Sequence, residues 1–219
     1  MNILGVMCSP RKRGNTKILL DEALAGAAES GATTDMILAG ELNIAPCDGC
    51  LSCMKTQKCH IKDDMQEAYA KVLAADGIIF ATPVYFLGPT AQAKTFVDRL
   101  YVQYRQQRLA NKVGGIIGVA GRLGHSQIWN FFNGFFALNR MIPTDFVGGF
   151  GRGDGDVRCD KHAMKSAWEL GRLVTAVANK HLTLPEEFDD TLNRVVSKKY
   201  GIDMGVRTGQ VRKGVERRT

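Results

Sequence analysis

The stretch Asn2-Ile-Leu-Gly-Val-Met-Cys-Ser-Pro-Arg-Lys-Arg-Gly-Asn-Thr16 decides the fold. Residues 2–7 are mostly apolar and predict a first strand, and a polar turn follows over residues 8–15. From residue 16 to residue 30 apolar side chains recur at helical spacing, and Asn15 or Thr16 can cap that helix. A strand that leads through a polar turn into a helix is the opening unit of a parallel α/β sheet.

The same alternation continues along the chain. We expect four more strands, at residues 33–38, 77–81, 113–119 and 144–147, and four more helices, at residues 63–75, 90–101, 126–141 and 161–180. Asp64 and Glu67 resemble a capping box at the start of the second helix. The fold class predicted is α/β: a flavodoxin-like three-layer sandwich around a five-stranded parallel sheet of order 2-1-3-4-5.

The domain organisation follows from length and composition. The chain has 219 residues, of which 45% are hydrophobic and 23% charged, so it can bury one sizeable core. We assign residues 1–184 to this domain and residues 185–219 to a C-terminal arm. The basic stretch over residues 207–218 is interpreted as a solvated surface, or as an attraction to acidic partner proteins.

Composition also limits the partners and the compartment. Apolar runs stay below the roughly 18–20 residues that a membrane span needs, and the N-terminus has no basic region typical of a signal peptide. We therefore expect a cytoplasmic protein with reduced thiols. The net charge is +7, but most lysines and arginines are dispersed, so nucleic acid is not favoured as a partner.

The turn after the first strand predicts an anion site. It leads into a helix N-terminus, where unpaired backbone N–H groups and the helix dipole favour negative charge. Ser9, Asn15 and Thr16 offer neutral donors, Arg11 can pair with phosphate oxygens, and Gly14 permits a close approach. The turn matches neither the dinucleotide nor the Walker pattern, which favours a mononucleotide phosphate. The alternative is a basic turn that binds nothing.

Two further loops are expected at the same edge, because a ligand of this sheet lies outside the carboxyl ends of strands 1 and 3. The loop after the third strand offers a stiff turn and aromatic surface for a flat ring, and the loop after the fourth would border that ring. The residues concerned are Pro83, Val84, Tyr85, Phe86, Gly121 and Arg122. Aromatic residues here could also serve ordinary packing, but the convergence of three loops favours a pocket.

Four of the six cysteines lie close together, with two, two and five residues between them: Cys47, Cys50, Cys53 and Cys59. Three cysteines in Cys-x-x-Cys-x-x-Cys succession are typical of ligands to a [4Fe–4S] cluster, whereas zinc usually takes two separated pairs. The spacing favours the cluster and leaves zinc, a redox disulfide or simple thiols as alternatives. Since the loop follows the second strand, we expect it at the same carboxyl edge.

Three other residues near this chemistry receive minor roles. Cys8 and Cys159 are interpreted as small buried residues or bystanders. His60 is interpreted as a surface group or as a neighbour of the ligands.

In these motifs the chain resembles the iron–sulfur flavoproteins within the NADPH-dependent FMN reductase group, over roughly residues 1–180. The matching segments are Ser9 to Thr16, Cys47 to Met65 and Thr82 to Phe86. The resemblance implies that the four clustered cysteines bind a [4Fe–4S] cluster, that Ser9, Arg11, Asn15 and Thr16 hold the FMN phosphate, and that residues 83–86 and 121–122 line the flavin. It also implies a homotetramer of paired dimers, in which a cluster serves a neighbouring subunit's flavin, and a ferredoxin-like electron donor.

The leading functional hypothesis is an electron-transfer flavoprotein that passes electrons between the cluster and FMN and on to a redox partner or small acceptor. A second hypothesis keeps FMN without a cluster: an NAD(P)H-dependent FMN or quinone reductase with zinc or free thiols in the cysteine loop. A third hypothesis, of another class, is a non-catalytic binding module whose cysteine loop is held together by a metal ion.

Overall fold

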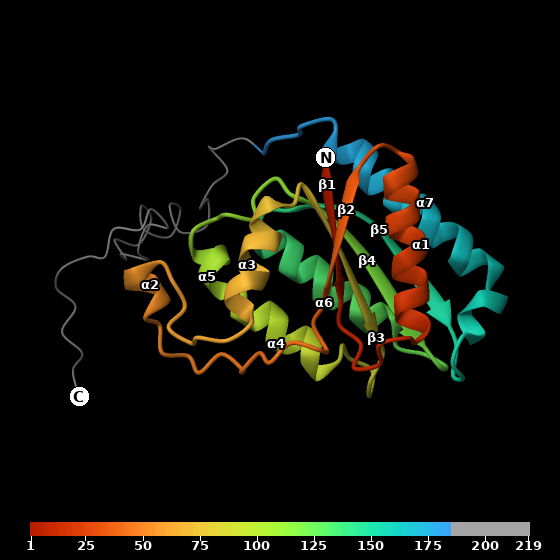
Figure 1. Cartoon of the computed structure of the whole chain (residues 1–219), viewed down its shortest axis with the longest axis horizontal. Helices are drawn as coiled ribbons and strands as arrows, with labels where there is room; N and C mark the ends of the chain where they lie inside the picture. Colours follow the sequence, from red (N-terminus) through yellow and green to blue (C-terminus); the bar gives the residue numbers. More distant parts are fainter. Residues whose placement is uncertain (185–219) are drawn as a thin grey trace, which may run out of the picture.

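The computed structural model describes residues 1–184, and the predicted C-terminal arm lies outside the described residues. Five parallel strands form one sheet in the order β2-β1-β3-β4-β5 (Figure 1). The strands are β1 (Asn2–Met7), β2 (Thr33–Leu38), β3 (Gly77–Pro83), β4 (Val113–Ala120) and β5 (Ile142–Phe150). This confirms the flavodoxin-like fold class and strand order predicted from the sequence.

Helices cover both faces of the sheet, which gives three layers (Figure 1). On one face lie α1 (Asn15–Glu29) and α7 (Lys161–Ala178); on the other lie α3 (Met65–Ala74), α4 (Ala91–Arg99), α5 (Tyr101–Arg105) and α6 (His125–Leu138). Side chains of a strand alternate between the two cores: Leu4 faces the α3, α4 and α6 side, and Ile3 faces the α1 and α7 side. Because both faces are buried, the central strands read as continuous apolar runs.

Phe80 of β3 is the centre of the larger core. Its ring stacks on Phe132 at 5.0 Å between centroids and meets the edge of Phe135 at 5.6 Å. Burial of one such aromatic side chain contributes roughly 1.5–3 kcal/mol, and the ring pairs add to it. The apolar face of α6 is thereby fixed on the sheet.

Several element boundaries differ from the sequence-based expectation. The predicted helix at residues 90–101 is two helices, α4 and α5, and the fifth strand extends over 142–150 rather than 144–147. A short helix α2 (Cys53–Thr56) and a 3-10 turn η1 (Asp156–Cys159) were not expected. Within the described residues, no helix combines the length and apolar character that a membrane crossing requires.

The predicted cap of α1 is wrong, and the predicted cap of α3 is right in position but does not bond its helix through its side chain. Gly14 occupies the N-cap of α1, and no side chain bonds the helix there. Asp64 is the N-cap of α3, but its carboxylate accepts from the backbone N–H of Asn43 at 2.7 Å instead of bonding its own helix. The physical reason is competition: a neighbouring loop takes up the side chain that the local pattern assigns to the cap.

Helices α1 and α7 touch backbone to backbone. A Cβ atom at Gly171 would overlap the carbonyl oxygen of Ala23, and one at Gly26 would overlap the carbonyl oxygen of Trp168. Glycine is therefore required at both crossing points for the two helices to lie this close.

We predict that Gly171→Ala lowers the free energy of unfolding by about 1–3 kcal/mol, because the added methyl group must push α1 and α7 apart. Gly134→Ala is the matched control, since Gly134 is an exposed helical glycine and the methyl group of an alanine there would meet nothing within 4 Å. It should stabilise the protein by about 0.5–1 kcal/mol. Urea unfolding measures both, and equal effects would contradict the close packing.

Candidate functional site

The loop after β1 is held in a compact turn before α1. Ser9 is 4% exposed, and its hydroxyl accepts from the backbone N–H of Arg11 at 3.1 Å. Asn15 and Thr16 are buried in the first turn of the helix. The first N–H groups of a helix have no partner within it, so this turn presents backbone donors to an anion.

Thr90 joins the loop after β1 to the loop after β3. Its hydroxyl donates to the carbonyl oxygen of Cys8 at 2.6 Å and accepts from the N–H of Ala93 at 3.2 Å, which caps α4. Its own N–H donates to the hydroxyl of Thr82 at 3.3 Å. Thr82 and Thr90 are fully buried and were not singled out in the sequence. Thr82 stood in the sequence only as the start of the segment Thr82 to Phe86, and Thr90 only as the residue before a helical run.

The loop after β3 makes a strained two-residue turn. The N–H of Tyr85 donates to Gly88 O at 2.9 Å, and the return bond is 3.0 Å. Phe86 and Leu87 between them have φ values of 47° and 63°, a left-handed conformation that bulky residues rarely adopt. Tyr85 is half exposed and Phe86 fully exposed. Such strain clusters at functional sites, and this turn presents an aromatic side chain outside the core.

A fourth loop at this edge was missed by the sequence analysis. The amide of Asn15 donates to Gly153 O at 2.8 Å, and its oxygen accepts from the N–H of Val157 at 3.3 Å. The guanidinium of Arg152 donates through Nε to Gly121 O at 3.1 Å. The run Gly-Arg-Gly-Asp-Gly-Asp over residues 151–156 was a usable signal. It was overlooked because the fifth strand was expected to end at residue 147.

The predicted nucleotide-site residues thus fall on loops at one edge of the sheet, where this fourth loop joins them. Arg11 forms an exposed ion pair with Asp154 at 3.5 Å. A Cβ atom at Gly124 would lie 2.5 Å from the side chain of Val84, so the loops after β3 and β4 pack together. Pro83 is the last residue of β3, and Gly121 and Arg122 directly follow β4 and are exposed.

All four clustered cysteines line one pocket of about 280 Å³. The opposite wall includes Asp98 near the end of α4 and Tyr101 at the start of α5. Gly49, Leu51 and Gln57 take left-handed conformations with φ of 69°, 58° and 58°, which lets the loop curl around the pocket. The structure therefore brings together the thiols that the spacing predicted as a group.

The position of this pocket corrects the sequence-based expectation. The loop starts at the carboxyl edge after β2, but Figure 1 shows that it carries α2 away from that edge, to the side of α5. The pocket is lined from the far end of α4, whereas the turn of Tyr85 and Phe86 precedes α4. The nine residues of α4 span about 14 Å. The cysteine pocket and the loops predicted to bind a nucleotide are therefore separate sites within one chain.

The electrostatics of the pocket follow from its crowding. Burial raises the pKa of Cys53, and the nearby sulfurs of Cys59, Cys50 and Cys47 raise it further. At the exposed rim, His60 Nε2 lies 2.7 Å from an oxygen of Asp48, and these two residues and Cys50 have potential ligand atoms within 4.8 Å of one another.

The two remaining cysteines differ from each other. Cys8 is buried, as expected, and burial raises its pKa to about 12, so it stays a thiol. Cys159 is exposed in the 3-10 turn η1, so of the two interpretations offered for it the buried one is wrong.

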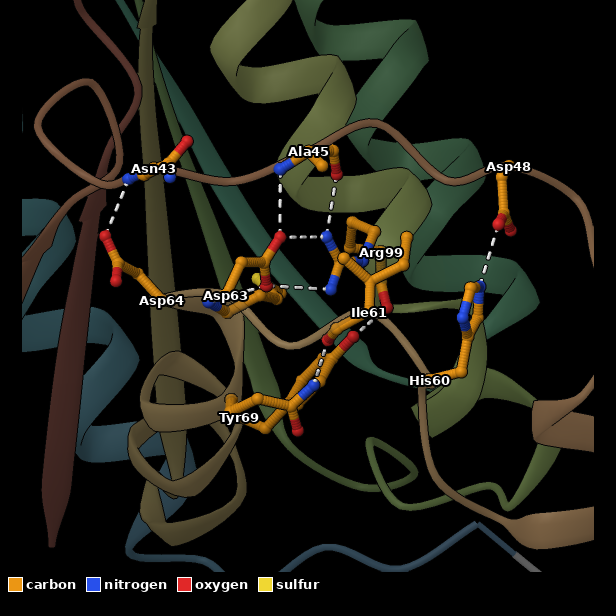
Figure 2. A network of polar contacts seen from close by, with 11 residues as sticks. Asn43, Ala45, Asp48, His60, Ile61, Asp63, Asp64, Tyr69 and Arg99 are labelled. Carbon is orange, nitrogen blue, oxygen red and sulfur yellow. Dashed lines mark hydrogen bonds and ion pairs between the residues drawn. The ribbon is translucent and has the colours of Figure 1, made fainter.

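A buried ion pair fixes both limbs of the cysteine loop (Figure 2). The guanidinium of Arg99, on α4, donates to the two carboxylate oxygens of Asp63 at 2.6 and 2.9 Å and to Ala45 O at 2.7 Å. Asp63 also accepts from the N–H groups of Ala45 and Met65. Ala45 precedes the four cysteines and Asp63 follows them, so one arginine ties the beginning and the end of the loop to α4.

The charges in this network perturb one another. Burial alone would raise the pKa of Asp63, but the bonds from Arg99 and Ala45 outweigh it and lower the pKa. Burial raises the pKa of Tyr69, and the nearby Cys59 raises it further; the Tyr69 hydroxyl donates to Arg99 O at 2.8 Å. Sequence reasoning missed Arg99, Tyr69 and the role of Asp63, because the pairing joins positions far apart in the chain.

The sheet order and the loop after β1 define a flavodoxin-like α/β protein. The chain belongs to the NADPH-dependent FMN reductase family, whose model matches residues 1–144. An iron–sulfur flavoprotein of Methanocaldococcus jannaschii is 39% identical over 81% of this chain and 97% of its own. One from Archaeoglobus fulgidus is 32% identical over 92% of this chain and 93% of its own.

Two solved structures support the fold. RosB, solved with bound 8-demethyl-8-formylriboflavin-5'-phosphate, aligns with a TM-score of 0.72 at 16% identity, over 100% of this chain and 93% of its own. A flavodoxin-like WrbA-like protein of Agrobacterium tumefaciens aligns with a TM-score of 0.61 at 19% identity, over 83% of this chain and 99% of its own. The family and the curated relatives make the chain a flavin-dependent oxidoreductase.

We predict that Asp63→Asn costs about 3–5 kcal/mol of stability at pH 7, because it leaves the buried Arg99 without its counter-charge. The folded-state pKa of Asp63 is lowered. Its stabilisation is therefore fully present above the ordinary aspartate pKa of about 3.9 and is lost as pH falls through the lower folded-state value.

Urea unfolding of wild type and variant between pH 7 and pH 2 should show the stability difference shrinking only in the acid range. The control is Asp35→Asn, which breaks the exposed pair with Lys71 and should cost about 0–1 kcal/mol. Equal costs at Asp63 and Asp35 would contradict the role of the buried pair.

Proposed function

We propose that the protein is an electron-transfer iron–sulfur flavoprotein that passes electrons between a [4Fe–4S] cluster and FMN, and on to a redox partner or a small acceptor. The observation that carries the proposal is the single pocket lined by all four clustered cysteines, in a chain of the FMN reductase family. When bound, the cluster would supply single-electron steps and FMN either one- or two-electron steps. The relatives named as iron–sulfur flavoproteins support the assignment.

The arrangement of the thiols fits a cluster better than a single zinc ion. Tetrahedral zinc with bonds of about 2.3 Å would draw four sulfurs to within about 3.8 Å of one another. Among the described residues, one set of three possible ligand atoms lies within 4.8 Å of one another. It belongs to Asp48, Cys50 and His60 and not to the cysteines alone. The four cysteines line one pocket, and no three of their sulfurs lie that close together in the described part of the chain, which suits ligands to separate irons of one cube.

The loops after β1, β3 and β4 fit FMN. We assign the phosphate to the amides at the start of α1 and to the side chains of Ser9, Arg11, Asn15 and Thr16, although the fold already uses the Asn15 amide to hold the fourth loop. We assign the ring to the residues that the two other loops supply: Pro83, Val84, Tyr85, Phe86, Gly121 and Arg122. The exposed aromatic turn offers the flat apolar surface that an isoalloxazine ring requires.

The distance between the two sites supports an oligomer. Since α4 separates the cysteine pocket from the nucleotide loops of the same chain, we propose a homo-oligomer, a dimer or tetramer, in which a cluster faces a neighbouring subunit's flavin. A ferredoxin-like protein as electron donor and a cytoplasmic location complete the proposal. The side chains of this chain bind and orient the cofactors, and the proposal assigns none of them a proton-transfer role.

One observation favours the alternative without a cluster. Asp48, Cys50 and His60 offer a carboxylate, a thiol and an imidazole close enough for a single zinc ion at the exposed rim. In that case the protein would be an NAD(P)H-dependent FMN or quinone reductase with a structural metal. Metal content distinguishes the two, because His60→Ala would then remove zinc, whereas it would leave the iron of a cluster in place.

We predict that Cys50→Ala, purified without oxygen, loses the broad visible absorption that a thiolate-bound cluster adds to the flavin bands, together with most of its iron. Cys159→Ala is the control, since it removes an exposed cysteine outside the pocket and should keep both signals. Unchanged iron in Cys50→Ala would contradict the ligand assignment.

We further predict that Arg11→Ala weakens FMN binding about tenfold, because it removes a charge-assisted bond to the phosphate, worth about 1.5–3 kcal/mol before solvent screening. Titration of the apoprotein with FMN, followed by quenching of flavin fluorescence, measures the affinity. Lys17→Ala is the control, because it removes a positive charge from the first turn of α1, where Lys17 pairs with Asp21. It should change the FMN affinity less than twofold. Equal losses would argue against a specific phosphate contact.

A further inference from the structure

We propose that Arg99 is a positioning residue of the cysteine pocket. Arg99 holds Cys59 in place and raises the reduction potential of the group bound in the pocket. This inference rests on the proposed cluster and adds to it the residue that sets its potential. Arg99 has a fully buried side chain, on a helix that the cysteine motif does not include.

Arg99 has hydrogen-bond donors that the described residues do not use. A guanidinium has five N–H donors, and in Arg99 three of them are used, two by Asp63 and one by Ala45. The two bonds to Asp63 occupy the edge formed by Nη1 and Nη2. In the described part of the chain, the buried Nε has no hydrogen-bond partner. Buried donors are nearly always satisfied, so the open edge indicates an acceptor that the protein alone does not provide.

The positive charge of Arg99 is only partly compensated. Burial alone would lower the pKa of Arg99, but Asp63, Tyr69 and the nearby Cys59 together raise it. The carboxylate of Asp63 also accepts from the N–H groups of Ala45 and Met65, so the loop backbone takes up part of its negative charge. The Nε of the guanidinium has no such partner within the described residues, which leaves the positive charge of the pair available to the neighbouring Cys59.

Cys59 and Tyr69 lie between this network and the pocket. Cys59 packs against the buried core that includes Tyr69, and it also lines the pocket. The Tyr69 hydroxyl bonds the Arg99 carbonyl oxygen at 2.8 Å, so α3 and α4 are joined beneath this cysteine. Donors and positive charge beside a sulfur ligand stabilise the more negative, reduced form of an iron–sulfur group. A higher reduction potential follows.

The test compares reduction midpoint potentials of the anaerobic holoprotein, followed by EPR of the reduced cluster. Asp63→Asn keeps the cation and removes its counter-charge, so the potential should rise. The double variant Arg99→Gln with Asp63→Asn removes both charges, so the potential should fall below that of wild type. Both changes break the same loop anchor, so a purely structural role would shift the two potentials in the same direction or not at all, and either result would overturn the inference.

Two further variants keep the test decisive. If Asp63→Asn does not fold, Arg99→Lys replaces it: this variant retains the charge, and its potential should lie above that of the double variant. Lys71→Met is the control, because it removes an exposed charge from α3 and should leave the potential unchanged. Wild-type protein without iron and sulfide would overturn the proposed function itself, whereas a normal cluster with equal potentials in all variants would overturn this inference alone.

Discussion

All five strands of the sheet run in the same direction, and this constraint determines where the chain can build a site. Parallel strands bring every strand-to-helix loop to one edge, where the loops after β1, β3, β4 and β5 meet. Two kinds of contact then fix their relative positions: Thr90 bonds the backbone after β1, and Asn15 bonds the loop after β5. These loops are therefore held by side chains at the starts of the helices: Thr90 caps α4, and Asn15 is the first residue of α1.

The cysteine loop obeys a different constraint. It begins at the same edge but is held by one buried arginine on α4, which binds residues on both sides of the four cysteines. A buried pair of this kind contributes less through net attraction than through the large cost of losing one partner. It fixes the geometry of a loop that has little secondary structure of its own. The nearby Cys59 is among the groups that raise the pKa of this arginine, so the anchor of the loop is also part of its electrostatics.

The sequence predicted the parts of this molecule that depend on local pattern. The parallel sheet followed from the alternation of apolar runs and helical repeats, and its strand order from five such units with a phosphate-type loop after the first strand. The grouping of the thiols followed from the spacing between Cys47 and Cys59. What failed depends on contacts between distant residues. Asp64 takes the N-cap position of α3, but its carboxylate bonds Asn43 instead of the helix, and the pairing of Asp63 with Arg99 joins positions 36 residues apart. The place of the thiols beside α5 likewise depends on how the loop packs, which spacing alone does not encode.

We propose that one chain holds two redox groups at separate places, a cluster in the thiol pocket and FMN at the loops of the sheet edge. Quantification of iron, acid-labile sulfide and flavin in the anaerobically purified wild-type protein tests this proposal. Four irons, four sulfides and one FMN per chain are expected, as the composition of one cube and one flavin requires. Flavin with zinc, or flavin with no metal, would contradict it.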